Sequence, residues 1–272
     1  MQVSFSSQPV GGHTKGPAVA GLFYPAEARQ LQHDVDQYLA EAEPLPDQVP
    51  KALIVPHAGY IYSGPVAASA YRQLRLLDHG IKTVLMLGPA HRVGFQGLAL
   101  HGADYFSTPL GKVPLDRELL NTLAKFPFVR PLDQAFAQEH CLEVQLPFLQ
   151  RLLQGFKLAP LLIGQSDYQQ VLQVLEMVVD DPETLIVVSS DLSHYHRYDD
   201  AKRMDADATR AIETLSPADL QHDHACGRLG VGGLLMLAKQ RGWKAVTLDL
   251  RNSGDTAGPR DQVVGYGAYA FI

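Results

Sequence analysis

The chain has 272 residues, of which 46% are hydrophobic and 19% charged, and its formal net charge is −6 at pH 7. This composition is typical of a globular protein with a full hydrophobic core. The negative charge argues against nucleic acid as a partner, because binding to phosphates needs a basic face. No apolar run approaches the roughly 18 residues of a membrane span, so no membrane partner is predicted either.

The N-terminal residues 1–17 are polar and rich in glycine and proline, which predicts a flexible arm ahead of one α/β domain over residues 18–272. The arm lacks the charged and apolar regions of a secretory signal peptide. The chain has two cysteines, Cys141 and Cys226, which are too few for a disulfide framework. A reducing cytoplasm is therefore the expected location.

Strand patterns and helix patterns alternate along the chain, which indicates an α/β fold. The predicted helices cover residues 25–42, 66–77, 117–125, 139–153 (with a start or kink at Pro147), 168–179, 199–215 and 226–240. The predicted strands cover residues 52–56, 83–88, 98–101, 157–163, 185–188, 245–250 and 262–272, and a hairpin or irregular loop is expected at 108–114. Asp116 is predicted to cap one helix and Gly242 to close another.

We therefore predict a single-domain three-layer α/β/α sandwich with a mostly parallel central sheet. The last two strands have no predicted helix between them and are expected to pair antiparallel. The glycine-rich stretch after His57 is expected to be a loop.

Three predicted strands lead directly to a histidine. The apolar runs ALIVP, TVLMLG and LIVV are followed within a few residues by His57, His91 and His194. The carboxyl ends of parallel strands meet at one edge of a sheet, where open α/β folds bind ligands. One such histidine could simply cap its strand, but three together favour a shared site, and neutral imidazole is a common metal ligand. Asp191 lies on the same loop as His194 and joins the candidate group.

Cys226 lies at the predicted start of an apolar helix, where the helix N-terminus favours the thiolate that binds metals. A role as a small buried hydrophobic residue is an equal alternative.

The stretch Glu139–Glu143 places His140 and Glu143 on one face if it is helical. This pair could orient ligands or transfer a proton, and a solvated helix start is equally compatible. The other histidines considered are predicted to lie at the surface: His13, His33, His79, His101 and His222.

Several motifs together resemble the MEMO family, also called AmmeMemoRadiSam system protein B. They are AGLFYP (20–25), VPHAGYIYSG (55–64), LGPAHRVG (87–94), TPLG (108–111), EHCLEVQLPFL (139–149), SSDLSHY (189–195), CGRLGVG (226–232) and the C-terminal NSGDTAG and VVGYGAYAF. The resemblance covers nearly the whole chain. It implies a fold like that of class III extradiol dioxygenases, which hold Fe(II) with two histidines and a carboxylate and leave positions open for substrate and O2.

Carried over to this sequence, the resemblance implies that His57 and His91 are metal ligands. Cys226 matches the third ligand position, where the dioxygenases have a carboxylate. The implied catalytic group consists of His194 as acid or base, His140 as a further active-site histidine, and Asp191. One transition-metal ion is the expected cofactor, with Fe(II) first and copper or zinc as alternatives, because a thiolate is a softer ligand than a carboxylate.

Two functions of different class follow. The first is an O2-dependent oxidoreductase that acts on a small substrate at a mononuclear non-haem site. The second is a non-catalytic metal-binding adaptor that binds a peptide or protein partner, and the family's prokaryotic name implies a radical-SAM protein as one such partner. Zinc-dependent hydrolysis is a third, weaker alternative.

Overall fold

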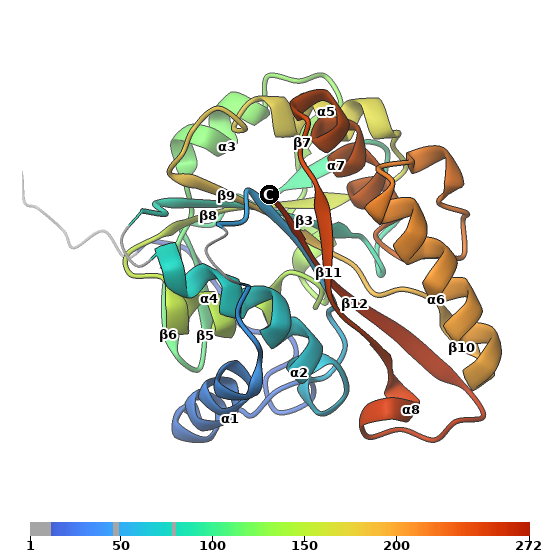
Figure 1. Cartoon of the computed structure of the whole chain (residues 1–272). Coiled ribbons are helices and arrows are strands. Elements are labelled where there is room, and N and C mark those ends of the chain that lie inside the picture. Colours follow the sequence, from blue (N-terminus) through green and yellow to red (C-terminus); the bar gives the residue numbers. More distant parts are fainter. Residues whose placement is uncertain (1–11, 46–48, 78–79) are drawn as a thin grey trace, which may run out of the picture.

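The computed structural model describes residues 12–45, 49–77 and 80–272. A large β-sheet runs through the centre of a single α/β domain (Figure 1). In spatial order its strands are β10 (His194–His196), β12 (Val263–Phe271), β2 (Ala52–Val55), β9 (Thr184–Ser189), β3 (Thr83–Pro89), β8 (Lys157–Ile163), β4 (Leu98–Leu100) and β7 (Val129–Pro131). Strand β11 (Ala245–Asn252) pairs with β12 beside this order.

The middle strands β2, β9, β3 and β8 are parallel to one another. Strands β12 and β4 join this group antiparallel, one on each side. The sheet is therefore mixed, and the prediction of a mostly parallel sheet holds for its middle and for the pairing of β4 with β7. The predicted antiparallel pairing of the last two strands is confirmed, although a short helix, α8 (Ser253–Thr256), separates β11 from β12.

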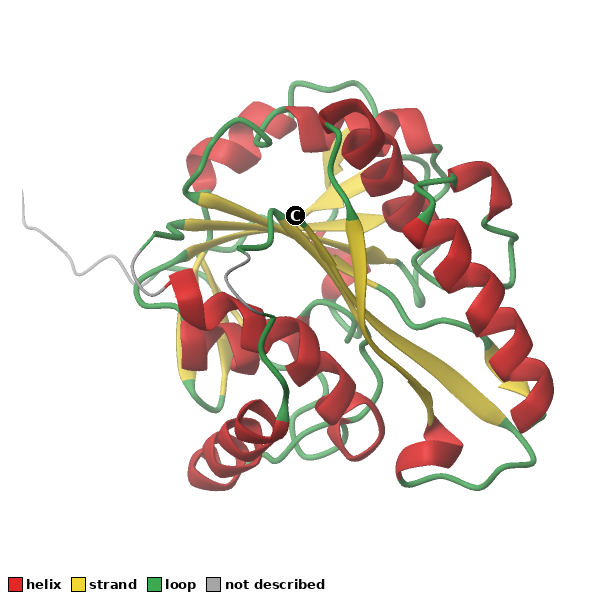
Figure 2. Ribbon diagram, viewed as in Figure 1, coloured by secondary structure: helices red, strands yellow, loops and turns green. Residues whose placement is uncertain are grey.

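Helices flank the sheet and bury its apolar middle strands (Figure 2). Helices α1 (Ala28–Glu41), α2 (Tyr60–Tyr71) and α4 (Leu146–Leu152) lie on one side. Helices α5 (Tyr168–Glu176), α6 (Tyr198–Glu213) and α7 (Arg228–Arg241) lie on the other, and α3 (Arg117–Leu123) packs beside β8. In the part of the chain that the structure describes, none of the helices combines the length and apolar character that crossing a membrane requires.

The predicted N-terminal arm lies partly outside the described residues. Where it is described, Thr14–Lys15 form β1 and pair in parallel with β5 (Tyr105–Thr108). Strand β5 also forms a hairpin with β6 (Gly111–Pro114), close to the predicted hairpin. Residues 14 and 15 therefore belong to a small sheet and not to a flexible arm, because the edge of β5 offers their backbone groups partners.

Helix α2 begins at Tyr60 and not at the predicted Val66, and it includes Pro65. A proline inside a helix removes the hydrogen bond to the carbonyl group four residues earlier. That carbonyl belongs to Ile61, which is 63% exposed, so water can donate a hydrogen bond to it. The glycine-rich stretch after His57 thus leads into a helix instead of forming a longer loop.

The helix caps explain most other boundaries. The carboxylate of Asp116 accepts a backbone N–H of the first turn of α3, as predicted, and Gly242 ends α7 with a φ of 67° that suits glycine. Helix α1 starts at Ala28 and not at Pro25, because the side chain of Glu27 accepts the first free N–H groups.

Candidate metal centre

The ends of neighbouring parallel strands bring the candidate side chains together. His57 follows β2, His91 follows β3, and Asp191 follows β9, which lies between these two strands. Cys226 approaches from the segment that precedes α7. The edge of the sheet therefore gathers side chains that are up to 169 residues apart in sequence.

Three donor atoms form a group that can hold a metal ion. They belong to His57, His91 and Cys226, and all lie within 4.8 Å of one another. Nε2 of His57 is 3.3 Å from Sγ of Cys226. His194, the third strand-end histidine of the sequence analysis, is not a member of this group.

A buried relay of hydrogen bonds orients the ring of His57. The hydroxyl of Ser189 donates its only proton to the carbonyl of Cys141 at 2.7 Å and accepts from the side-chain amide of Gln145 at 2.9 Å. Its 2.9 Å contact with Nδ1 of His57 must therefore have the imidazole as donor. Nε2 of His57 then keeps its lone pair toward Cys226. The hydroxyl of Tyr71 donates to Oε1 of Gln145 at 2.9 Å and holds the amide in place.

Glu139 orients His91 in the same way. Its Oε1 lies 2.9 Å from Nδ1 of His91, and its Oε2 accepts the backbone N–H of His91 at 2.7 Å. Oε1 also accepts the N–H groups of His140 and Cys141. Burial opposes ionisation, but these hydrogen bonds, with those from His91 foremost, lower the pKa of Glu139 to about 2. The carboxylate is charged at neutral pH, so Nδ1 of His91 is the donor and Nε2 is free for a metal.

Sequence reasoning chose Glu143 for this task and missed Glu139. The predicted helix over 139–153 does not begin at its first residue: a 3-10 turn covers Glu143–Gln145, and α4 starts at Leu146. The carboxylate of Glu139 draws in the N–H groups of the next two residues and competes with helix formation there. Its position directly before His140 was the only signal in the sequence.

Glu143 points to the N-terminal segment and not to the donor group. Its oxygens accept the N–H groups of Ala18–Val19 at 2.5 and 2.9 Å and the hydroxyl of Tyr24 at 2.7 Å. The segment that it anchors places Phe23 against His140, with ring centroids 4.8 Å apart. Glu143 therefore affects the site only through this segment.

Cys226 precedes α7, which begins at Arg228, so it does not lie inside the first turn as predicted. The backbone N–H of Asp191 donates to its sulfur at 3.3 Å. A Cβ at Gly227 would come within 2.7 Å of the Cβ of Ser190, so only glycine lets this segment approach the strand end. Burial, and then the Asp191 carboxylate, raise the pKa of the Cys226 thiol instead of lowering it. A metal that binds this sulfur must displace its proton.

Asp191 borders the donor group without belonging to it. Its Oδ1 accepts the backbone N–H of His57 at 2.7 Å, and its Oδ2 is 4.0 Å from Nε2 of the same residue. Burial raises the pKa of Asp191, although the N–H of His57 opposes this effect. Asp191 therefore ties the loop after β9 to the loop after β2.

The predicted residues His140 and His194 lie at different distances from the donors. The ring of His140 stacks on that of His91 at 4.9 Å and stands edge-on to that of His57 at 5.5 Å. Nδ1 of His140 is buried and lies 3.2 Å from Oε1 of Glu139, although the two atoms are not aligned as a hydrogen bond. His194 lies further along the same wall, on β10, with its ring 5.8 Å from that of Tyr195.

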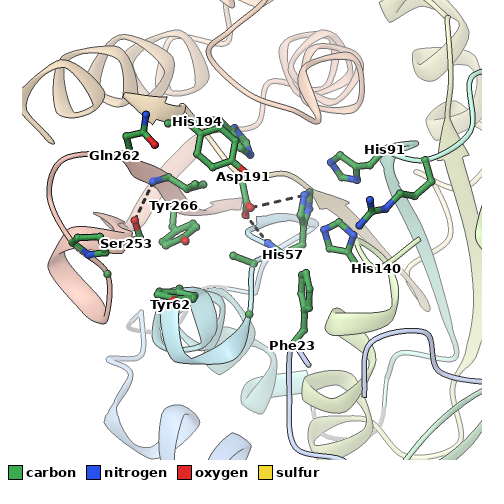
Figure 3. A pocket seen from close by; sticks show the side chains of 17 residues that line it. Phe23, His57, Tyr62, His91, His140, Asp191, His194, Ser253, Gln262 and Tyr266 are labelled. Carbon is green, nitrogen blue, oxygen red and sulfur yellow. Dashed lines mark hydrogen bonds and ion pairs between the residues drawn. The ribbon is translucent and has the colours of Figure 1, made fainter. Parts of the chain in front are cut away.

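The site opens into a cavity of about 650 Å³ (Figure 3). His57, His91 and His140 lie at one end of the cavity, and Tyr62, Ser253, Gln262 and Tyr266 lie at the other. Cys226 does not line it, so the sulfur approaches the donor group from behind the wall. The donor group is therefore open to the cavity on the side of His57 and His91.

One histidine predicted at the surface is buried. His101 is 5% exposed and stands edge-on to Phe106 and Phe136, so it is a core residue away from the site. His13, His33 and His222 are exposed as predicted, and His79 lies outside the described residues.

Asp205 of α6 anchors the loop that carries His194, because its Oδ1 accepts the N–H of Ser193 at 3.0 Å. Burial raises the pKa of Asp205 from 3.8 to about 6, against the weaker effects of Ser193 and His196. The folded state thus favours the protonated acid. The protonated Asp205 contributes its full stabilisation at pH values below the pKa of this side chain in the unfolded chain. This stabilisation, about 3 kcal/mol in all, is lost as the pH rises through 6.

We therefore expect Asp205→Asn, which keeps the oxygen acceptor without the charge, to stabilise the protein at about pH 8 and not at about pH 4. Urea unfolding at the two pH values measures this difference. The control is Asp207→Asn, which removes an exposed carboxylate from the same helix. An Asp205→Asn variant that unfolds like the wild type at both pH values would contradict the assignment.

A family model and several relatives match almost the whole chain. The family model described as Memo-like protein matches residues 15–270. A MEMO1 family protein of Aquifex aeolicus is 36% identical over 267 residues, which cover 94% of this chain and 98% of the relative. A MEMO1 family protein of Sulfolobus acidocaldarius is 35% identical over 279 residues, with the same coverage. An uncharacterized protein of Escherichia coli K12 shares 13% identity at a TM-score of 0.48, over 82% of this chain and 99% of that one.

Proposed function

The chain belongs to the Memo-like protein family, and from this premise we propose that it is a metal-dependent oxidoreductase that uses O2 on a small substrate. One transition-metal ion would be held by His57, His91 and Cys226. The proposed architecture is the three-layer sandwich of class III extradiol dioxygenases. The helices on both sides of the central sheet are compatible with this architecture.

The orientation of the donors carries the proposal. Both histidines use Nδ1 to donate to a protein acceptor, so both have Nε2 available for a metal. The 3.3 Å between Nε2 of His57 and Sγ of Cys226 suits two ligands of one ion, because metal–nitrogen and metal–sulfur bonds are about 2.0 and 2.3 Å long. The residues therefore fit a resident metal ion.

Two imidazoles and a thiolate suit iron, copper or zinc, and we propose Fe(II). When bound, a redox-active ion with open positions supplies the activation of O2 beside a bound substrate. The cavity on the histidine side provides the space for that substrate.

The protein's own groups would then position the substrate and move its proton. His194 lines the cavity and is the proposed general acid or base. The ring of His140 lines the cavity beside His57 and His91 and is a proposed contact for the substrate. Asp191 fixes the backbone of His57, and Phe23 covers His140 from the side of the N-terminal segment.

We expect His194→Ala to keep its metal and to lose turnover by about 10²–10⁴-fold, the usual contribution of a positioned acid or base. Metal content by plasma mass spectrometry and O2 uptake on the best substrate measure the two effects. The control His222→Ala removes an exposed histidine and should leave both unchanged. Full turnover in His194→Ala would end this role.

The proposed function itself is tested with an oxygen electrode. Iron-loaded protein is screened against a panel of catechols and related oxidisable aromatics. Uptake of O2 that disappears in Cys226→Ser supports the oxidoreductase. Stoichiometric metal without O2 uptake on any compound would overturn it in favour of the metal-binding adaptor.

A further inference from the structure

The cavity continues well beyond the metal donors. Its volume of about 650 Å³ lies within the range of pockets that bury drug-sized ligands. We call the part lined by Tyr62, Ser253, Gln262 and Tyr266 the distal end, and Figure 3 shows it opposite the imidazoles of His57 and His91. A substrate that filled only the space beside the metal would leave this end to water.

The two ends differ in charge. The carboxylate, guanidinium and imidazole groups that line the cavity come from the loops after β2, β3 and β9, from the stretch around His140, and from β10, which carries His194. The distal end is built from α2 and from residues 253–266 and contributes only hydroxyl, amide, apolar and aromatic groups to the lining. A charged group of a ligand would find no opposite charge there, and burying an unpaired charge is costly.

The distal end is suited to an aromatic ring. Tyr62 and Tyr266 present aromatic side chains to it, and ring pairs attract one another beyond the effect of area alone. The side-chain amide of Gln262 also lines this end, where it can donate to or accept from a ligand.

Tyr195 gives an independent observation. It lines the cavity with a φ of 61°, in the left-handed region that bulky residues rarely adopt, and it is 71% exposed. Strained residues persist where the surrounding structure holds them, and they cluster at ligand sites. Here the unusual conformation belongs to an exposed tyrosine at the cavity wall, where a ligand would cover its ring.

We propose that the distal end, together with Tyr195, is a subsite for an uncharged aromatic part of the substrate, whose oxidisable part lies at the metal. The position of the aromatic part rests on the residues of the distal end. The position of the oxidisable part at the metal rests on the proposed function. The substrate class is thus a two-part molecule and not a single small ring.

Binding to zinc-loaded protein tests the proposal, because zinc permits calorimetry without oxidation. The probes are catechol, 4-phenylcatechol, and the same biaryl with a carboxylate on the second ring. We expect the phenyl group to tighten binding about tenfold or more and the carboxylate to cancel that gain.

Tyr62→Ala should remove the gain of 4-phenylcatechol and leave catechol unchanged. Ile61→Ala is the matched control, since it truncates the neighbouring exposed residue of the same helix, which does not line the cavity. Tyr195→Gly is a second variant that suits the backbone conformation and should also reduce the gain.

The outcomes separate the two proposals. If catechol binds and 4-phenylcatechol binds no tighter, the subsite is refuted and the proposed function stands. If 4-phenylcatechol binds equally with and without zinc and Tyr62→Ala abolishes this binding, the subsite stands and the metal-centred function is refuted. If neither probe binds zinc-loaded protein, the subsite is refuted, and O2 uptake by the iron-loaded protein decides the proposed function.

Discussion

Cys226→Ser is expected to lower the affinity for Fe(II) by more than 100-fold, which is beyond the 10–100-fold effect of losing a residue that only orients a ligand. A serine hydroxyl does not ionise near neutral pH and is a harder ligand than a thiolate. Because Cys226 does not line the cavity, the change should leave the space for substrate intact. Competition with a chromophoric chelator under anaerobic conditions measures the affinity.

The other cysteine provides the matched control. Cys141 is buried, and its sulfur lies 3.2 Å from the carbonyl of Pro89, so Cys141→Ser keeps a donor to that carbonyl. Cys141→Ser should bind metal like the wild type. In cobalt-loaded protein, the sulfur-to-metal absorption should disappear in Cys226→Ser alone. Equal affinity and equal spectra in the two variants would exclude Cys226 as a ligand.

Glu139→Gln should have the second largest effect, on both stability and metal binding. The carboxylate accepts three N–H groups at Oε1 and one at Oε2; in Glu139→Gln the amide oxygen can accept at one of these positions, but the amide nitrogen cannot accept at the other. Each buried donor left without an acceptor costs about 1–3 kcal/mol, so the free energy of unfolding should fall by about 3 kcal/mol. Metal affinity should fall by about 10–100-fold, because His91 loses the group that orients it.

Glu143→Gln separates the two effects. Glu143 is also buried and also accepts backbone N–H groups, but it serves Ala18–Val19 and not a metal ligand. Its replacement should reduce the free energy of unfolding in urea while metal affinity stays near the wild-type value. If Glu143→Gln weakens metal binding as much as Glu139→Gln, the loss reflects general destabilisation and the role assigned to Glu139 is wrong.

Parts of the fold depend on short-range patterns and were predictable. The buried strands that precede His57 and His91 are short, β-branched apolar runs with a polar boundary, and such runs favour a strand that is covered on both faces. The cap at Asp116 and the end at Gly242 depend on groups within a few residues. The donor group itself was reached by combining strand ends with the family resemblance.

Other features depend on groups that are distant in sequence. The chain by itself determined that His57 and His91 stand at strand ends and that an apolar helix begins close to Cys226. Only the tertiary structure decided that Glu139 and Ser189 orient the two histidine rings of the donor group. It alone decided that Glu143 turns to the N-terminal segment and that burial raises the pKa of Cys226. It also decided that the sheet is antiparallel on both sides of its parallel middle. The physical reason is that strand and helix periods follow from neighbouring residues, whereas a hydrogen-bond partner and a degree of burial follow from which distant segments the fold packs together.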